Sequence, residues 1–497
     1  MLGRLWGQSV HTMILAALLR RAWPLFSLFL AGCAGGPQEE SGSQRDSSEA
    51  TFRIFSFWTE GGEREALNEL VSTFETEHPE LTIDVFQQDG GLQGFQKMFR
   101  LRSEQNTYPN VIQANAGLGV LEWALRGRGD TDSSILLDFG PSLDPTLVRA
   151  LHPEALRSVS YEEETTDPEH CGKSPPCTVT RRFGMPLNVH RNNLLLYDSR
   201  FLREELDVPA PSSWEELIQL CERVRAEFGI APFAIGGKDK WPLHVLFEGL
   251  LLSVAEPGFY DELWRGQLAL TAGGVTMKTV EAALDRFLEL RACSSRDAGS
   301  VRWSDAVERV VQSKERGSAS ASAAFTATGD WAVGLLQSHG LKLGEDFDLV
   351  PFPGTEDVFV MTVDTFAIPL GSSQKAAGLE FIQTIGRAEV QSRFSRVKGS
   401  IPARVDATVD PSNAVSIRNY CDLWGGGNAH ETAPECHPGA APKPPVYSIA
   451  MLLPNRAVEA LDQALFALLQ DGEKETVRIL LRNYYPLFRR SAADSRL

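Results

Sequence analysis

The first half of the chain alternates between strand-like and helix-like spacing of its apolar side chains. Residues 52–57 are rich in Phe and Ile and predict a buried strand, whereas residues 64–77 place apolar side chains at helical spacing. Residues 81–86 alternate apolar with polar side chains and predict a second strand. This order predicts a βαβ unit, and therefore a parallel, open sheet. A helical stretch at 92–104 and a buried strand at 110–114 follow.

The middle of the chain is mostly helical by the same criterion, and strands return later. Strand patterns occur at 347–352 and 358–368, and the C-terminal part, 447–492, is again helical. Ser213 before Trp214, with acidic residues in the next turn, fits a helix N-cap. The helices predicted in the middle cover 213–227, 241–254, 276–292, 304–314 and 330–339. The sequence therefore predicts an α/β fold.

The first 32 residues have the pattern of an export signal. Two apolar runs are separated by Arg20 and Arg21, and the second run, 22–32, is far shorter than the roughly 20 residues that span a bilayer. Basic residues followed by a short apolar run and small residues are typical of a secretory signal peptide. Both Met1 and Met13 fit as its start, and a buried N-terminal helix is the alternative interpretation.

The end of this segment resembles the lipobox of bacterial lipoproteins. It reads Leu30-Ala31-Gly32-Cys33, and in that pattern the cysteine thiol receives diacylglycerol and becomes the mature N-terminus. Residues 33–50 are small and polar after Cys33, as in a flexible tether. We therefore expect signal peptide 1–32 to be removed. The product is then an exported protein, lipid-anchored to the bacterial membrane through Cys33 and facing the periplasm or the cell exterior.

Composition narrows the classes of partner. The chain has 497 residues, 43% of them apolar, which is enough for a large packed core spread over two or three domains. Asp and Glu outnumber Lys and Arg by 65 to 48, and no basic run stands out. We expect no nucleic-acid partner, because neutralising phosphates requires many cations.

The cysteines fit an oxidising compartment. Lipidation of Cys33 leaves six of the seven cysteines, an even number that allows up to three disulfides. Cys221 and Cys293 lie in helical patterns and fit buried thiols. The favoured pairs are Cys171 with Cys177 and Cys421 with Cys436, since each closes a loop rich in Pro or Gly.

The sequence contains no complete enzyme or cofactor signature. Gly236-Gly237-Lys238 resembles the end of a phosphate loop, but Pro232 stands where the first glycine is required. Neither a GxSxG elbow nor an HExxH motif occurs, and no histidine follows another at i+3 or i+4. We therefore expect no catalytic residue, no metal site and no cofactor.

The remaining chemistry is a set of aromatic and planar polar side chains at predicted strand or loop ends. Ligands bind outside the carboxyl ends of strands in open α/β sheets. Aromatic rings suit the flat C–H faces of a pyranose, whereas carboxylates, amides and lysines suit its hydroxyls. A Trp more often belongs to the core, and Asp330 also fits a helix N-cap. The candidates are Phe57, Trp58, Glu63, Gln113, Asn115, Trp241, Asp330, Trp331, Asp364 and Lys398.

Taken in order, these residues resemble the bacterial extracellular solute-binding proteins (family 1) of carbohydrate ABC transporters. The resemblance runs from about Phe52 to Arg404 and is closest to the subgroup that binds glucose and related monosaccharides. Its stretches are Ser56-Phe57-Trp58 with Glu63, Pro109 to Gly117, Met185-Pro186, Pro211 to Leu217, Gly236 to Trp241, Ala327 to Ala332, Gly344 to Phe347, Pro351 to Thr355, Asp364 to Phe366, and Lys398 to Arg404.

The resemblance implies roles for the candidate residues. The first-strand aromatics wall the sugar, Glu63, Gln113 and Asn115 bind hydroxyls, Trp241 and Trp331 close over the ring, and Asp364 and Lys398 fix hydroxyls near the hinge. His437 matches a C-terminal histidine contact, although His430 competes for that match. The subgroup often has two Trp where this chain has Phe57-Trp58.

The resemblance also implies a two-lobed periplasmic-binding-protein fold with a ligand cleft between the lobes. Crossing segments are expected near 185, 362 and 401. Lobe one then covers 51–184 with 363–400, and lobe two covers 187–361 with 402–497.

The implied function is capture of a glucose-like monosaccharide by hinge closure and its delivery to an ABC transporter membrane permease, by a monomer that is not an enzyme. The alternatives are a receptor for an oligosaccharide or polyol, and an envelope lipoprotein that has lost sugar binding. A secreted glycoside hydrolase, acting through two carboxylates, is the alternative from the enzyme class.

Overall fold

The computed structural model of the protein describes residues 51–87, 109–125, 135–171, 175–271, 273–311, 323–425, 434–436 and 441–483. The predicted signal peptide, the tether with Cys33, the helix at 92–104 and His437 lie outside these residues, as does His430.

The first sheet contains the predicted βαβ unit. Strand β1 (Thr51–Ser56) is followed by helix α1 (Gly61–Glu77) and strand β2 (Thr82–Gln87), and β1 pairs in parallel with β2 and with β3 (Val111–Asn115). Phe52 and Ile54 of β1 are buried, as are Leu67 and Leu70 of α1. The apolar periodicity thus forms the core of this lobe.

The sheet is mixed rather than wholly parallel, which corrects the prediction. Within the described residues its order is β12-β6-β11-β3-β1-β2, and a further strand, β13, pairs with β11. Strand β11 runs antiparallel to β3 and β6, because the chain enters it on the way back from the other lobe. The other strands of this sheet are β6 (Met185–Arg191), β11 (Phe359–Ala367), β12 (Ile401–Pro402) and β13 (Pro445–Tyr447).

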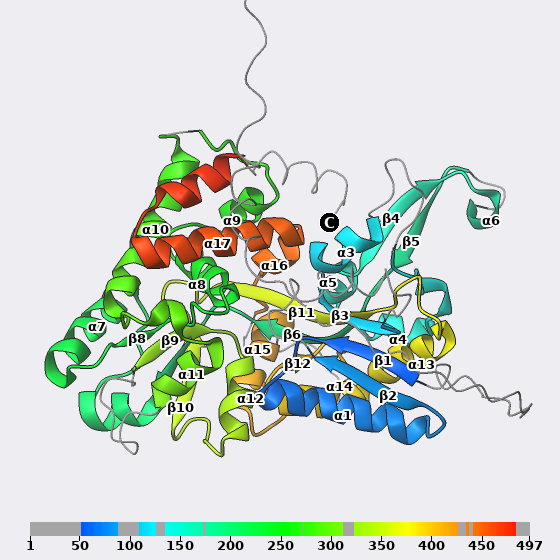
Figure 1. Ribbon diagram of the computed structural model, residues 1–497, viewed down its shortest axis with the longest axis horizontal. Helices are drawn as coiled ribbons and strands as arrows, with labels where there is room; N and C mark the ends of the chain where they lie inside the picture. Colours follow the sequence, from blue (N-terminus) through cyan, green and yellow to red (C-terminus); the bar gives the residue numbers. More distant parts are fainter. Residues whose placement is uncertain are drawn as a thin grey trace, which may run out of the picture. The chain divides into compact units, whose positions relative to one another are not determined.

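A second, four-stranded sheet has the order β10-β7-β9-β8 in the described chain. Its strands are β7 (Leu194–Asp198), β8 (Phe233–Ala234), β9 (Phe325–Thr328) and β10 (Phe347–Pro351). Figure 1 shows the helices of this region gathered around it. They are α7 (Trp214–Phe228), α8 (Trp241–Leu252), α9 (Pro257–Trp264), α10 (Val275–Cys293), α11 (Trp303–Val311) and α12 (Trp331–Ser338), with short helices η2 (Phe201–Leu206) and η3 (Ala298–Ser300). We call the two sheets, each with its helices, lobe one and lobe two.

The remaining helices belong mainly to lobe one and to the C-terminal part. They are α3 (Leu118–Leu125), η1 (Gly140–Ser142), α4 (Pro145–Arg149), α5 (Pro153–Arg157), α6 (Pro168–Cys171), α13 (Lys375–Ile385), α14 (Ala388–Lys398), α15 (Ala414–Trp424), α16 (Ile449–Leu452) and α17 (Asn455–Asp471). Strands β4 (Ser160–Thr165) and β5 (Cys177–Arg182) form a separate antiparallel ribbon.

Most elements expected from periodicity are confirmed. The strands near 110–114, 347–352 and 358–368 are β3, β10 and β11, and the five central helices are α7, α8, α10, α11 and α12. Ser213 caps α7 in a reciprocal capping box with Glu216. The helical stretch from 447 onward is divided, because Pro454 separates α16 from α17.

Both predicted disulfides are confirmed. Cys171 is joined to Cys177 beside the β4–β5 ribbon, and Cys421 at the end of α15 is joined to Cys436. Cys221 and Cys293 are buried free thiols in α7 and α10, as expected.

Two links carry the chain between the sheets. Residues 192–193 join β6 to β7, and residues 352–358 join β10 to β11. The lobe boundaries expected near 185 and 362 stay predictions, as does the third near 401. We propose that the first two crossings lie at these links.

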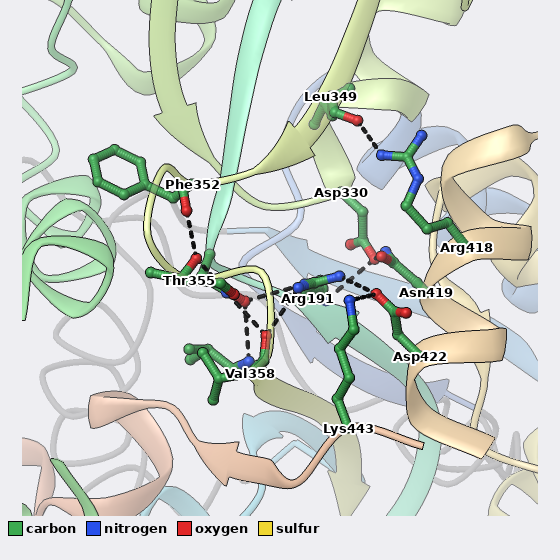
Figure 2. Close-up of polar contacts among 12 residues, drawn as sticks. Arg191, Asp330, Leu349, Phe352, Thr355, Val358, Arg418, Asn419, Asp422 and Lys443 are labelled. Atoms are coloured by element: carbon green, nitrogen blue, oxygen red, sulfur yellow. Dashed lines mark hydrogen bonds and ion pairs between the residues drawn. The ribbon is translucent and has the colours of Figure 1, made fainter. Parts of the chain in front are cut away.

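The buried side chain of Arg191 ties the two links to α15 (Figure 2). Its Nη1 donates to Asp422 Oδ2 at 2.6 Å, and its Nη2 donates to the Val358 carbonyl at 2.8 Å. Lys443 Nζ lies 2.8 Å from the same Asp422 oxygen. Asn193 Nδ2 donates to Thr355 Oγ1 at 2.9 Å. These bonds give the link region a defined geometry.

A glycine contact places α12 against lobe one. A Cβ on Gly62 of α1 would lie 2.6 Å from the carbonyl carbon of Gly334 in α12, which is closer than side-chain carbons come. The absence of a Cβ on Gly62 lets α1 and α12 touch, whereas a Cβ on Gly334 would lie 2.6 Å from the Val397 carbonyl oxygen of α14. Trp331, in the first turn of α12, is thereby held at the junction of the lobes.

Candidate functional site

A cavity of about 180 Å³ is lined by side chains from both lobes. Eight of the predicted site residues line it, namely Phe57, Trp58, Glu63, Asn115, Trp241, Trp331, Asp364 and Lys398. They come from loops, strands and helices far apart in the sequence. The structure thus brings these residues together, and their role in ligand binding stays a prediction.

Gln113 lies behind the cavity wall rather than on it. Its side chain is fully buried, and its Oε1 accepts hydrogen bonds from Ser56 Oγ at 2.6 Å and from Phe57 N at 3.1 Å. These bonds fix the turn that follows β1. Gln113 therefore positions Phe57 and Trp58.

Asp330 likewise supports the wall. It occupies the N-cap position of α12 but makes no side-chain cap bond, so the N-cap interpretation describes its place and not its contacts. Its Oδ1 bonds His190 Nδ1, and its Oδ2 accepts from Asn419 Nδ2 at 2.8 Å and from Arg191 N at 3.2 Å. Asp330 thereby connects the cavity to the Arg191 cluster, which Figure 2 shows beside it.

Aromatic rings form two walls of the cavity. In lobe one, Trp58 is 1% exposed and packs on Phe366 and Phe394, with ring centroids 5.9 and 5.1 Å away. Trp58 is therefore both a core residue and part of the cavity lining. In lobe two, Trp241 packs on Trp303 at 5.8 Å and on Trp331 at 5.6 Å between centroids.

A buried charge network lies between these walls. His190 Nε2 is 3.2 Å from Asp364 Oδ2, and its other ring nitrogen bonds Asp330. Lys398 Nζ bonds Glu63, lies 4.0 Å from Asp364 and stands 4.6 Å from the centroid of the Trp58 ring. The cations therefore hold the Glu63 and Asp364 carboxylates in place at the cavity surface.

The network shifts the protonation of its members. Burial by itself lowers the pKa of His190, but the negative charge of Asp330 and the hydrogen bonds to Asp330 and Asp364 raise it to about 9. Burial raises the pKa of Asp364, and the charges of Lys398 and His190 outweigh this effect, so the pKa is lowered. Both shifts favour the charged forms of these two groups, the imidazolium of His190 and the carboxylate of Asp364.

Several lining residues were not predicted from the sequence. They include His190, Asn192, Asp239, His244, Trp303, Thr362, Asn455, Glu459 and Asp462. Thr362 precedes Asp364 by two residues in β11, so the two-residue repeat of a strand could have identified it. The lining residues of α17 gave no such signal, because in the sequence their polar positions look the same as an ordinary solvent-exposed helix face.

Apart from Asp364 Oδ2, which is ion-paired with His190, three buried polar atoms of the lining lack a hydrogen-bond partner among the described residues. They are Trp331 Nε1, a donor, Asn192 Oδ1, an acceptor, and Thr362 Oγ1, which can be either. Each residue is at most 9% exposed. A buried polar group without a partner costs about 1–3 kcal/mol. These atoms can therefore bond a ligand that carries both donors and acceptors, such as a polyhydroxylated ring.

The described residues lack two further features, a metal-binding cluster and a membrane-spanning helix. No cluster of three or more His, Cys, Asp or Glu side chains is arranged to hold a metal ion. In the same part of the chain, no helix combines the length and the apolar character needed to cross a bilayer.

Comparison with known proteins gives consistent matches. The family model described as "Bacterial extracellular solute-binding protein" matches residues 59–392. An uncharacterized ABC transporter extracellular-binding protein of Pyrococcus horikoshii is 26% identical over 395 residues, covering 79% of this chain and 80% of that one. A probable sugar-binding periplasmic protein of Brucella suis is 27% identical over 372 residues, covering 74% and 79%.

A solved structure supports the fold. The bacterial solute receptor AcbH, whose described preference is for β-D-galactopyranose, superposes with a TM-score of 0.66 at 16% identity. The superposition covers 88% of this chain and 98% of that receptor. At this level of identity the likeness shows the two-lobed fold alone.

Proposed function

Because the chain belongs to the bacterial extracellular solute-binding protein family, whose model matches residues 59–392, we propose that it captures a glucose-like monosaccharide for import. Family membership and the sugar-binding relatives make it a carbohydrate-binding component of an ABC transporter. The relatives are transport proteins rather than enzymes, and we propose that this chain likewise binds its cargo without converting it.

The observation that carries the proposal is the set of unpartnered buried polar atoms between two aromatic walls. Trp331 Nε1, Asn192 Oδ1 and Thr362 Oγ1 offer both hydrogen-bond donors and acceptors. The Trp rings offer flat apolar faces beside them. A pyranose matches both features. The cavity volume of about 180 Å³ lies below the usual 300–1,000 Å³ of drug-sized sites, which supports a single small ring.

The mechanism that we propose is hinge closure. Phe57, Trp58 and Lys398 come from lobe one, whereas Trp241 and Trp331 come from lobe two. A sugar that contacts both sets gains free energy only when the lobes are together, so binding shifts the population toward the closed form. The closed form is then the one that the membrane permease recognises, and a lipid on Cys33 would hold the receptor at the membrane.

A thermal-unfolding panel tests the choice of cargo. A sugar present at 100 times its dissociation constant adds about 2.7 kcal/mol to stability. We expect this stabilisation with at least one aldohexose or aldopentose and not with maltose, raffinose or sorbitol. A response confined to an oligosaccharide or a polyol would contradict the monosaccharide proposal, and no response to any sugar would contradict sugar binding itself.

A further inference from the structure

Helix α17 forms one wall of the cavity, although it lies beyond the residues that the family model matches. Asn455, Val458, Glu459 and Asp462 line the cavity, and spacings of three and four residues place them on one face of the helix. The adjacent side of the helix, including Leu461, Leu465 and Leu468, is buried in the core. Figure 1 shows α17 beside α8, on which it packs.

Hydrogen bonds fix the helix at both ends of this polar face. At its start, Asn455 N donates to Glu122 Oε2 at 2.9 Å, and Asn455 Nδ2 donates to the Gly119 carbonyl at 3.2 Å. Farther along, Asp462 Oδ1 is 2.7 Å from His244 Nδ1. A residue between two such anchors is held in a constant position relative to the cavity. Glu459 occupies that position.

Glu459 differs from the other carboxylates of the cavity. Glu63 bonds Lys398, Asp364 pairs with His190, and Asp462 pairs with His244. Asp239 accepts from Trp303 N at 2.7 Å. Across the parts of the chain that the structure describes, Glu459 has neither an ion pair nor a hydrogen bond from its side chain. Its carboxylate is therefore available to a ligand in a cavity that also holds unpartnered Trp331 Nε1 and Thr362 Oγ1.

We infer that Glu459 is a specificity-determining residue. Its carboxylate accepts a hydrogen bond from a hydroxyl or ammonium group that the sugar presents to α17. It repels a carboxylate or phosphate in the same place, because two like charges in a confined site disfavour each other. The ligand class is thus neutral sugars and amino sugars, and uronic acids are rejected. This inference rests on the proposed sugar-binding function.

The test compares the chain with variants Glu459→Gln and Glu459→Ala by titration calorimetry. The probes are glucose, glucosamine and glucuronate, together with galactose, galactosamine and galacturonate. Asp471→Asn removes the same charge from the exposed last turn of α17 and serves as the matched control. Circular dichroism and melting temperature establish that each variant is folded.

We expect the unaltered chain to prefer the neutral or amino sugar over the uronate by roughly tenfold or more, the size of one hydrogen bond to a charged group. Glu459→Gln should reduce this preference several-fold, and Glu459→Ala should also weaken binding of the preferred sugar. Asp471→Asn should change neither. If a sugar binds but the preference stays within twofold of its original value in both variants, this inference is wrong and the proposed function stands. If no sugar binds the unaltered chain, either in this titration or in the thermal-unfolding panel, both the inference about Glu459 and the proposed function are wrong.

Discussion

Trp331 presents its ring to the cavity, while its indole N–H has no partner among the described residues. Replacing Trp331 by Phe keeps an aromatic face and removes that donor. We expect sugar binding to weaken by roughly three- to tenfold, the worth of about one hydrogen bond of 0.5–1.5 kcal/mol. The free energy of unfolding without sugar should fall by less than for a Trp→Phe change that breaks a hydrogen bond, because removal of an unsatisfied group offsets part of the lost packing. Calorimetry and urea unfolding measure the two effects.

Trp214 provides the control for this substitution. Its Nε1 donates to Glu289 Oε2 at 3.0 Å, away from the cavity lining. Trp214→Phe should therefore lower the free energy of unfolding and leave sugar affinity unchanged. The account of Trp331 is contradicted if Trp331→Phe destabilises the sugar-free protein more than Trp214→Phe does while affinity is unaltered.

His190 makes stability depend on pH in a defined direction. Its pKa in the folded protein is about 9, above the ordinary 6.5, so protonation favours folding. The contribution is complete below about pH 6.5 and is lost as pH rises through about 9, amounting to at most roughly 3 kcal/mol. Urea unfolding of the sugar-free chain should show this decline, and His190→Gln should lack it. An equal decline in the variant would assign the pH dependence to other groups.

At the scale of elements, an ion pair joins α1 of lobe one to α11 of lobe two. Arg302 Nη2, just before α11, lies 3.1 Å from Glu60 Oε1, just before α1. Both groups are partly exposed, and such pairs contribute about 0–1 kcal/mol. We expect Arg302→Gln to weaken sugar binding by up to roughly fivefold at low salt and by less at high salt. Unchanged affinity at low salt would show that the pair does not stabilise the closed form.

Elements with a strong local pattern were predictable, and their pairing directions were less so. The β1–α1–β2 unit follows from periodicity because its core side chains are local in sequence. The antiparallel direction of β11 depends on the chain crossing to lobe two and back, which no local pattern encodes. Strand β13 is three residues long and begins with Pro445 directly after Pro444, and it is too short for a periodic signal.

At the scale of the whole molecule, the site was predictable where a residue follows a strand or carries a family motif. Phe57, Trp58 and Asp364 were found in this way, and all line the cavity. The sequence predicts the correct region for Gln113, but its side chain lies behind the cavity lining. A position at a strand end does not specify which residues the side chain contacts. Glu459 was missed because only the packing of α17 distinguishes its face from a solvated one.

The proposed function requires a small sugar to bind between the aromatic walls of the two lobes. The decisive measurement is a crystal structure of the protein with its stabilising monosaccharide. We expect the ring between Phe57–Trp58 and Trp241–Trp331, with its hydroxyls on Trp331 Nε1, Asn192 Oδ1 and Thr362 Oγ1. A saturating sugar found elsewhere on the molecule, with this cavity holding only water, would contradict the account.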